Sequence, residues 1–466
     1  MTETVSLTKH VAEFTAKTGF DDIPADVHAL GKKNMLDGLA AGLAGSVMPA
    51  LRILRDYLTG LGCPGTATVL GSSITLAPRF AALANGTSIH VDDFDDTMQA
   101  EVGRFQGIHP TGPVTAALLA VGEGEHRSGR DILTAYQVGV EVACKTFEAT
   151  HVNHILNGFH STGTCGMLGA AAAVANLYGV DAEKTRQVIG IAAAQACGLQ
   201  ANFGTMMKSY HVGRSAECGI LSADLAVRGF TASPISLESD RGFFMAQGGG
   251  IEEHRIRGKL GNPWSFADRG IWIKPWPTGS LAHAAMTLMV QLIDEHDLSL
   301  ENVERIAVKT SDNIHHTLLH HHPKTELEAK FSLEFGLAAL LVQRKLTLSD
   351  FTDEFVLRPD IQEAISKIRY DTFSQQESRE NGYGIITAFI DIDMKDGKRI
   401  SDRLDFGKGS KANPMSFDEV SDKFRDCAAF AGWPKGKAET AIELMATLED
   451  VPDIAKLTAA LGGAKS

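Results

Sequence analysis

The sequence contains few cysteines, no long apolar run and no excess of basic residues. Its six cysteines are scattered over 466 residues without a Cys-x-x-Cys pair, a usage typical of reduced thiols and of neither a disulfide framework nor a zinc site. No uninterrupted apolar segment reaches the roughly 18 residues of a transmembrane helix, and the N-terminus shows no signal peptide. The formal net charge of −13 argues against nucleic acid or an anionic membrane as a partner. We therefore expect a cytoplasmic globular protein.

Sequence motifs for nucleotides and flavins are also missing. There is no Gly-x-Gly-x-x-Gly after a strand, no Walker loop and no Gly-x-Ser-x-Gly elbow. If the chain is an enzyme, we expect it to need no cofactor. It would use acids, bases and cationic side chains on a small anionic substrate.

The hydrophobic periodicity predicts a mainly α protein with two kinds of domain. Residues 1–268 have the spacing of helices almost throughout, and their alanines and glycines let helix axes approach closely. Residues 269–400 contain a strand-like segment near 305–310 and an alternating segment near 387–394, which indicate a smaller α+β lid. Residues 401–466 become helical again, and we expect them to return to the helical domain.

The segment His90–Thr97 carries the densest chemistry of the chain. It places four carboxylates, a histidine and a hydroxyl in eight residues, shortly after an apolar segment. Carboxylates beside a buried helix cost free energy unless they are paired, hydrogen-bonded or used in catalysis. The structural alternative is an acidic helix end that caps its neighbours. Its Asp-rich stretch is also similar to the magnesium–diphosphate site of terpene synthases, but no second metal motif accompanies it.

Three further segments carry candidate functional residues. His160 stands at the start of a helix, where unpaired N–H groups favour an anion, although a capping role is the alternative. Lys208 and His211 precede a helix expected near Arg214, and either a solvated or a ligand-facing lysine fits there. Lys274 lies where we expect the two domains to meet, in a proline-rich stretch that would also suit a rigid linker.

The histidine run 315–322 favours a solvated loop or a pocket rim over a metal site. His316 and His320 could share a helix face, but no carboxylate or cysteine stands at a helpful spacing. The sequence therefore predicts no metal site.

Taken together, these segments resemble the MmgE/PrpD family, which includes 2-methylcitrate dehydratases, cis-aconitate decarboxylases and iminodisuccinate epimerases. The resemblance covers nearly the whole chain and implies a large helical domain, a smaller α+β lid, a homodimer and a small polycarboxylate substrate. The matching segments are 90–97, 158–163 with the alanine-rich helix after it, 208–213, 274–277, 330–332 and 407–415.

The resemblance also implies a set of site residues. The family's pocket positions fall on Asp93, Thr97, His109, His160, Lys208, Lys274 and His211, with His90 as a further substrate-binding residue. We hypothesise that His160 and Lys208, or His109 in place of one of them, act as acid and base. Asp93 would orient a partner, and Thr97 would hold a substrate carboxylate.

Two departures from the decarboxylase-like members lie in the expected lid. Those members carry a histidine where this chain has Thr278-Gly279, and the nearest histidine here is His283. They carry a tyrosine where this chain reads Leu318-Leu319-His320. The departures favour an epimerase acting by α-proton abstraction on an amino-polycarboxylate such as iminodisuccinate. The alternatives are a lyase similar to 2-methylcitrate dehydratase or cis-aconitate decarboxylase, and a non-catalytic scaffold.

Overall fold

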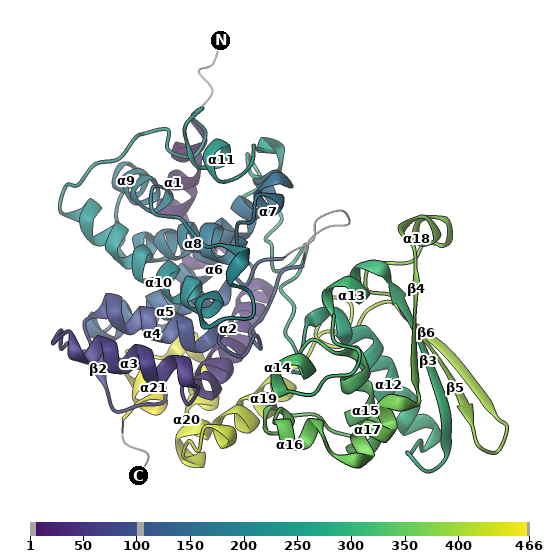
Figure 1. The fold of residues 1–466 in the computed structure, drawn as a ribbon. Coiled ribbons are helices and arrows are strands. Elements are labelled where there is room, and N and C mark those ends of the chain that lie inside the picture. The colour runs from purple at the N-terminus through teal and green to yellow at the C-terminus, as the bar shows by residue number, and fades with distance from the viewer. Residues whose placement is uncertain (1–5, 100–106, 464–466) are drawn as a thin grey trace. The chain divides into compact units, whose positions relative to one another are not determined.

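The computed structural model describes residues 6–99 and 107–463 and divides the chain into two compact units. The helical unit comprises Met1–Ile271 and Ser416–Ser466, and the α+β unit comprises Trp272–Met415 (Figure 1). The change in hydrophobic periodicity predicts domain boundaries at 268/269 and 400/401. The α+β unit instead extends to Met415, because strand β6 (Arg399–Leu404) pairs with the strand before it and completes the sheet.

The core of the helical unit is built from long helices rich in alanine and glycine. Where two of these helices meet, a Cβ at Gly213 would collide with the Leu83 carbonyl oxygen, and a Cβ at Gly169 would lie 2.6 Å from that of Ala143. Only glycine permits such close approach of two backbones. The helices are α2 (Ala25–Gly45), α4 (Pro78–His90), α5 (Thr111–Gly124), α6 (Gly129–Ala149), α8 (Ser161–Tyr178) and α10 (Met206–Val227).

Shorter elements surround this core. Two short strands pair in an antiparallel ribbon that the all-helical prediction misses. The ribbon strands are β1 (Ala67–Thr68) and β2 (Thr75–Leu76), and the helices are α1 (Leu7–Lys17), α3 (Pro49–Gly60), α7 (Asn153–Leu156), α9 (Ala182–Ala193), α11 (Phe243–Ala246), α19 (Phe417–Phe430), α20 (Lys435–Ala446) and α21 (Ala455–Leu461).

The ends of two core helices position candidate residues. Helix α8 begins directly after His160 and ends at Gly179, whose φ of 66° closes it in the left-handed region, as its sequence predicts. Helix α10 begins at Met206 and not near Arg214, because the Thr205 hydroxyl accepts a hydrogen bond from the Met207 N–H at 3.2 Å. Lys208 therefore lies in the first turn of a helix.

The α+β unit is built on a four-stranded sheet of order β4-β3-β5-β6, which Figure 1 shows beside its helices. Strands β3 (Val303–Ser311) and β4 (Ile368–Phe373) are parallel, and β5 (Ala388–Met394) is antiparallel to β3 and β6. Helix α17 (Pro359–Ser366) ends just before the chain enters β4 at Ile368. The helices of this unit are α12 (His283–His296), α13 (Asp312–Thr317), α14 (Glu326–Ala329), α15 (Leu333–Gln343), α16 (Asp353–Val356), α17 (Pro359–Ser366) and α18 (Gln375–Asn381).

The C-terminal helices belong to the helical unit. Helix α19 begins with a capping box in which the side chains of Ser416 and Glu419 each bond the other's backbone N–H. It packs on α2, where Lys423 Nζ lies 2.5 Å from Asp37 Oδ1, with both side chains buried. Among the described helices, none is long and apolar enough to cross a membrane.

Candidate active site

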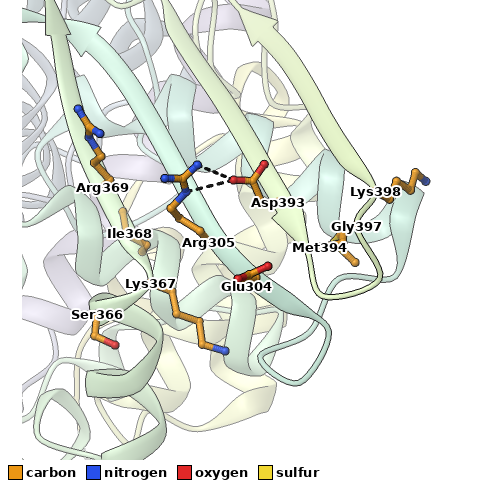
Figure 2. A pocket seen from close by; sticks show the side chains of 10 residues that line it. All are labelled: Glu304, Arg305, Ser366, Lys367, Ile368, Arg369, Asp393, Met394, Gly397 and Lys398. Carbon is orange, nitrogen blue, oxygen red and sulfur yellow. Dashed lines mark hydrogen bonds and ion pairs between the residues drawn. The ribbon is translucent and has the colours of Figure 1, made fainter.

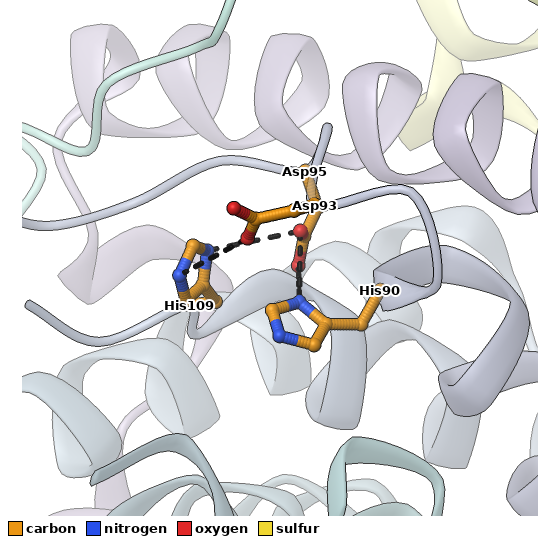
Figure 3. Close-up of side chains that lie close together, drawn as sticks. All are labelled: His90, Asp93, Asp95 and His109. Atoms are coloured by element: carbon orange, nitrogen blue, oxygen red, sulfur yellow. Dashed lines mark hydrogen bonds and ion pairs between the residues drawn. The ribbon is translucent and has the colours of Figure 1, made fainter. Parts of the chain in front are cut away.

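The acidic segment folds back against the end of helix α4. His90 is the last residue of α4, and Asp93 adopts a φ of 53°, in the left-handed region that an aspartate tolerates better than most residues. This turn brings Asp95 against the His90 ring, with both carboxylate oxygens 2.9 Å from His90 Nδ1 (Figure 3). Both side chains are fully buried, so the pair is shielded from water.

His109 approaches the same carboxylates from the segment before α5. Its Nδ1 lies 2.7 Å from the backbone oxygen of Asp96, which accepts the ring's N–H. The Nε2 atom, on the other side of the ring, lies 4.0 Å from Asp93 Oδ1 (Figure 3). The backbone N–H of His109 donates to the Thr162 hydroxyl in α8, which ties the segment to a second core helix.

Lys208 contributes the positive charge of the site from the first turn of α10. Its Nζ lies 2.6 Å from Asp93 Oδ1, and 5.5 Å from the centre of the Phe203 ring. The ammonium group and the carboxylate come from segments 115 residues apart in sequence. Lys208 and Asp93 are about one-fifth exposed, so their charges are partly shielded from water.

His160 and His211 form a second imidazole pair beside the first. Their Nδ1 atoms lie 3.1 Å apart, and the His160 ring stacks on His90 with 5.9 Å between the ring centres. His160 precedes α8 as its N-cap residue, but its side chain makes no capping hydrogen bond. Burial, followed by the nearby charges of His90, Lys208 and His109, lowers the pKa of His160 well below 6.5. His160 is therefore a neutral base or donor at pH 7, and not a cation.

The structure brings together six of the predicted site residues, and these are His90, Asp93, His109, His160, Lys208 and His211. Thr97 is buried, and its hydroxyl lies 3.5 Å from the Ile108 backbone oxygen. Lys274 is also buried, but it belongs to the α+β unit. In that unit His283, at the start of α12, has its Nε2 3.1 Å from the Thr278 hydroxyl.

Several residues that hydrogen-bond to the acidic segment and hold it in place were not predicted from the sequence. Asp96 Oδ2 accepts hydrogen bonds from Asn34 Nδ2 at 2.8 Å and from the Thr111 hydroxyl at 2.5 Å. Burial, with Asp37 and Asp95 nearby, raises the pKa of Asp96 to about 8. Lys423 donates to the backbone oxygen of Phe94 at 2.7 Å. Asp95 and Asp96 were visible in the acidic segment, whereas nothing local to Lys423 signals its role.

The fold brings together a group of possible metal ligands that the sequence analysis does not identify. Among the described residues, one group of possible ligands converges, with its donor atoms all within 4.8 Å of one another. Its members are His90, Asp93, Asp95 and His109 (Figure 3). The sequence conceals this group because His109 follows the aspartates by more than ten residues and joins them only through the fold.

A separate pocket of about 640 Å³ lies on the α+β unit (Figure 2). Arg305 within it is paired with Asp393 at 2.6 Å, and Lys367 Nζ donates to the backbone oxygen of Leu300 at 2.7 Å. None of the predicted site residues lines this pocket. Its lining residues are Glu304, Arg305, Ser366, Lys367, Ile368, Arg369, Asp393, Met394, Gly397 and Lys398.

Several known proteins are similar to this chain over more than nine-tenths of its length. Cis-aconitate decarboxylase of Homo sapiens is 29% identical over 446 residues, which cover 93% of this chain and 89% of that protein. The enzyme of the same name from Mus musculus is 27% identical over 93% of this chain and 88% of its own length. That of Aspergillus terreus is 27% identical over 97% of this chain and 95% of its own length.

These relatives correct the finer part of the sequence-based expectation. They are named as decarboxylases, so they favour the lyase alternative over the iminodisuccinate epimerase. The profile of the MmgE/PrpD N-terminal domain matches residues 9–255, and that of the MmgE/PrpD C-terminal domain matches residues 276–450. The chain therefore belongs to the MmgE/PrpD family.

Proposed function

We propose that this protein is a lyase that decarboxylates a small unsaturated polycarboxylate of the cis-aconitate type, with no cofactor. The observation that carries the proposal is the Lys208–Asp93 pair, 2.6 Å apart, surrounded by four imidazoles in the N-terminal domain of the family. Similarity to cis-aconitate decarboxylases over more than nine-tenths of the chain supports the substrate class.

The reaction needs a group that stabilises negative charge and a group that delivers a proton. One carboxylate leaves as CO2 when its carbon–carbon bond breaks, and the electron pair of that bond passes into the remaining conjugated carboxylate. The resulting carbanion takes one proton from the enzyme, so each turnover releases one CO2 and consumes one proton. Fixed positive charge near the developing enediolate lowers the barrier of this step.

Lys208 is suited to both tasks. Its ammonium group stabilises the developing charge and donates the proton, while Asp93 keeps the Nζ atom in position. His160, held neutral by burial, serves as a hydrogen-bond donor or as the base that exchanges a proton with the substrate. His109 is the alternative acid or base, because its Nε2 faces Asp93.

The remaining predicted residues bind carboxylate groups in this proposal. Thr97 and His211 offer a hydroxyl and an imidazole in the helical unit, and His90 offers a further imidazole that is paired with Asp95. The role of Lys274, a buried lysine of the α+β unit, in binding substrate stays a prediction. A homodimer as the working assembly stays a prediction.

An epimerase is the second candidate, and the two departures in the α+β unit favour it. Thr278 stands where decarboxylase-like members carry a histidine, and Leu318-Leu319-His320 replaces their tyrosine. His283 contacts Thr278 and therefore brings an imidazole back to this segment, which weakens the case for a different reaction.

The test is to incubate the protein with cis-aconitate, 2-methylcitrate and chiral iminodisuccinate in separate reactions in deuterated water. The proposal predicts CO2 release with cis-aconitate and one deuterium bound to carbon in the product. Stereochemical change of iminodisuccinate without CO2 release from cis-aconitate would establish the epimerase instead. His126→Gln is the matched control, because His126 pairs with Asp453 in an exposed contact outside the site.

A further inference from the structure

The cluster His90, Asp93, Asp95 and His109 has the composition of a transition-metal site. Two imidazoles and two carboxylates bring their donor atoms within 4.8 Å of one another, and His90 and Asp95 are buried. Imidazole nitrogen favours Zn²⁺, Co²⁺ or Cu²⁺, whereas Mg²⁺ favours oxygen ligands and retains its water. The two carboxylates would neutralise the charge of one divalent ion.

Hydrogen bonds around His109 already orient it as a ligand. Histidines that bind metals commonly donate their other ring N–H to a carboxylate or a backbone carbonyl, which fixes the tautomer and the ring plane. His109 Nδ1 lies 2.7 Å from the Asp96 backbone oxygen and donates to it, so in the neutral ring Nε2, on the side of Asp93, is the nitrogen left for a metal ion. Lys423 and the hydrogen bonds of the Asp96 side chain hold this backbone segment in place.

We propose that this cluster binds one divalent transition-metal ion, with Zn²⁺ as the expected ion, when no substrate is bound, and that the ion inhibits the enzyme. The Lys208 ammonium group lies 2.6 Å from Asp93 Oδ1, so a metal ion bound to this carboxylate competes with the ammonium group and repels it. Metal binding therefore disturbs the Lys208–Asp93 pair on which the proposed reaction depends. The inhibition rests on the proposed function, whereas the binding does not.

The histidine run of the α+β unit is the competing site that an experiment must separate. The rings of His315 and His321 stack with 4.4 Å between their centres, and His321 Nδ1 lies 2.7 Å from Glu334 Oε1. His321 is one-third exposed and lies outside the helical unit. His321→Gln therefore removes a metal-binding side chain without touching the cluster.

The binding test is isothermal titration calorimetry of the metal-free protein with zinc chloride. The variants Asp93→Asn and His109→Gln change the two most exposed members of the cluster, which limits the risk of unfolding, and thermal melting checks each fold. Loss of an outer-shell partner alone weakens metal affinity by about 10–100-fold, so loss of a ligand should weaken it by about 100-fold or more. We expect one tight site in the wild type and in His321→Gln, and none in either cluster variant.

The proposal would be overturned if tight zinc binding survives in a folded cluster variant or disappears in His321→Gln. The absence of a tight site in the wild type would also overturn it. The inhibition is measured separately, as competition between zinc chloride and cis-aconitate and its reversal by a chelator. Because calorimetry needs no turnover, a wild type that binds zinc but leaves cis-aconitate unchanged would count against the proposed function alone.

Discussion

Single residues in this protein acquire their chemistry from the backbone conformation of the acidic segment. The left-handed φ of Asp93 separates its carboxylate from that of Asp95, so the first faces Lys208 and the second faces His90. The residue types indicated the acidic segment, His160 and Lys208, and the family resemblance implied Asp93 and His109. These four residues do lie together. The pairing of His90 with Asp95 could not be predicted, because it depends on a turn that no local signal specifies.

Asp96 should make the folded state less stable as the pH rises. Its pKa in the folded protein is about 8, against the usual 3.8, so the folded protein keeps a proton that the unfolded chain loses. The stability due to this group is complete below about pH 4 and is lost as the pH rises to about 8. The Asp96→Asn variant cannot ionise at this position, so it should not lose this stability as the pH rises.

Thermal unfolding at pH 5 and pH 9, with a chelator present, checks this prediction. The difference in Tm between Asp96→Asn and the wild type (variant minus wild type) should be larger at pH 9 than at pH 5. An unchanged or reversed difference would show that Asp96 is already ionised in the folded protein.

His160 should remain neutral in mildly acidic solution. Because burial and nearby positive groups lower its pKa well below 6.5, its protonation should not reduce turnover until the pH falls well below that value. The measurement is kcat with saturating cis-aconitate between pH 5 and pH 8, with His126→Gln as the matched control. If protonation of His160 makes kcat fall as the pH is lowered, with a midpoint at or above pH 6.5, then burial does not keep the His160 imidazole neutral.

At the scale of helices, the site depends on where α4, α8 and α10 begin and end. Helix α8 was predictable because an alanine-rich segment follows residues 158–163 and is closed by Gly179. The start of α10 was placed too late, since the Thr205 cap precedes two methionines that do not signal a helix boundary. Contacts between distant elements, such as α19 with the acidic segment, were beyond sequence reasoning because they join residues 329 positions apart.

Lys423→Met should strongly destabilise the helical unit. Lys423 pairs with buried Asp37 and donates to the Phe94 backbone oxygen, so its loss leaves Asp37 without this cation in a dry environment. Breaking a buried ion pair typically costs about 3–5 kcal/mol of the free energy of unfolding. Urea unfolding measures this cost.

The double variant Asp37→Asn/Lys423→Met provides the internal comparison for this ion pair. It should recover part of the lost stability, because neither charge is then left alone in the core. A single variant as stable as the wild type, or a double variant no more stable than Lys423→Met, would contradict the role of this pair.

At the scale of the whole molecule, the mainly α class was predictable because the period of the apolar residues is clear over most of the chain. Strand β4 was missed because its exposed and half-buried residues follow directly on a helix, without a turn signal. The α+β unit has its own apolar core, with buried residues from α12, α15 and the sheet. The helical unit is discontinuous, since α19 to α21 return to it.

The two units should differ in whether a continuous fragment of the chain folds on its own. Residues 272–415 should fold on their own and unfold cooperatively, because their core is complete. Residues 1–271 should not, because they lack the helix that packs on α2 and supplies Lys423. Circular dichroism during thermal unfolding checks both fragments, and cooperative unfolding of 1–271 would contradict the second expectation.

The most direct test of the account is the kcat/KM of Lys208→Met for cis-aconitate, measured beside the wild type and Lys184→Met. Lys184 is an exposed lysine near the start of α9 and is the matched control. A general acid typically contributes about 10²–10⁴-fold to the rate. The account predicts a loss of that size in Lys208→Met with an unchanged Tm, and wild-type activity in Lys184→Met. Turnover of cis-aconitate by Lys208→Met at the wild-type rate would contradict it.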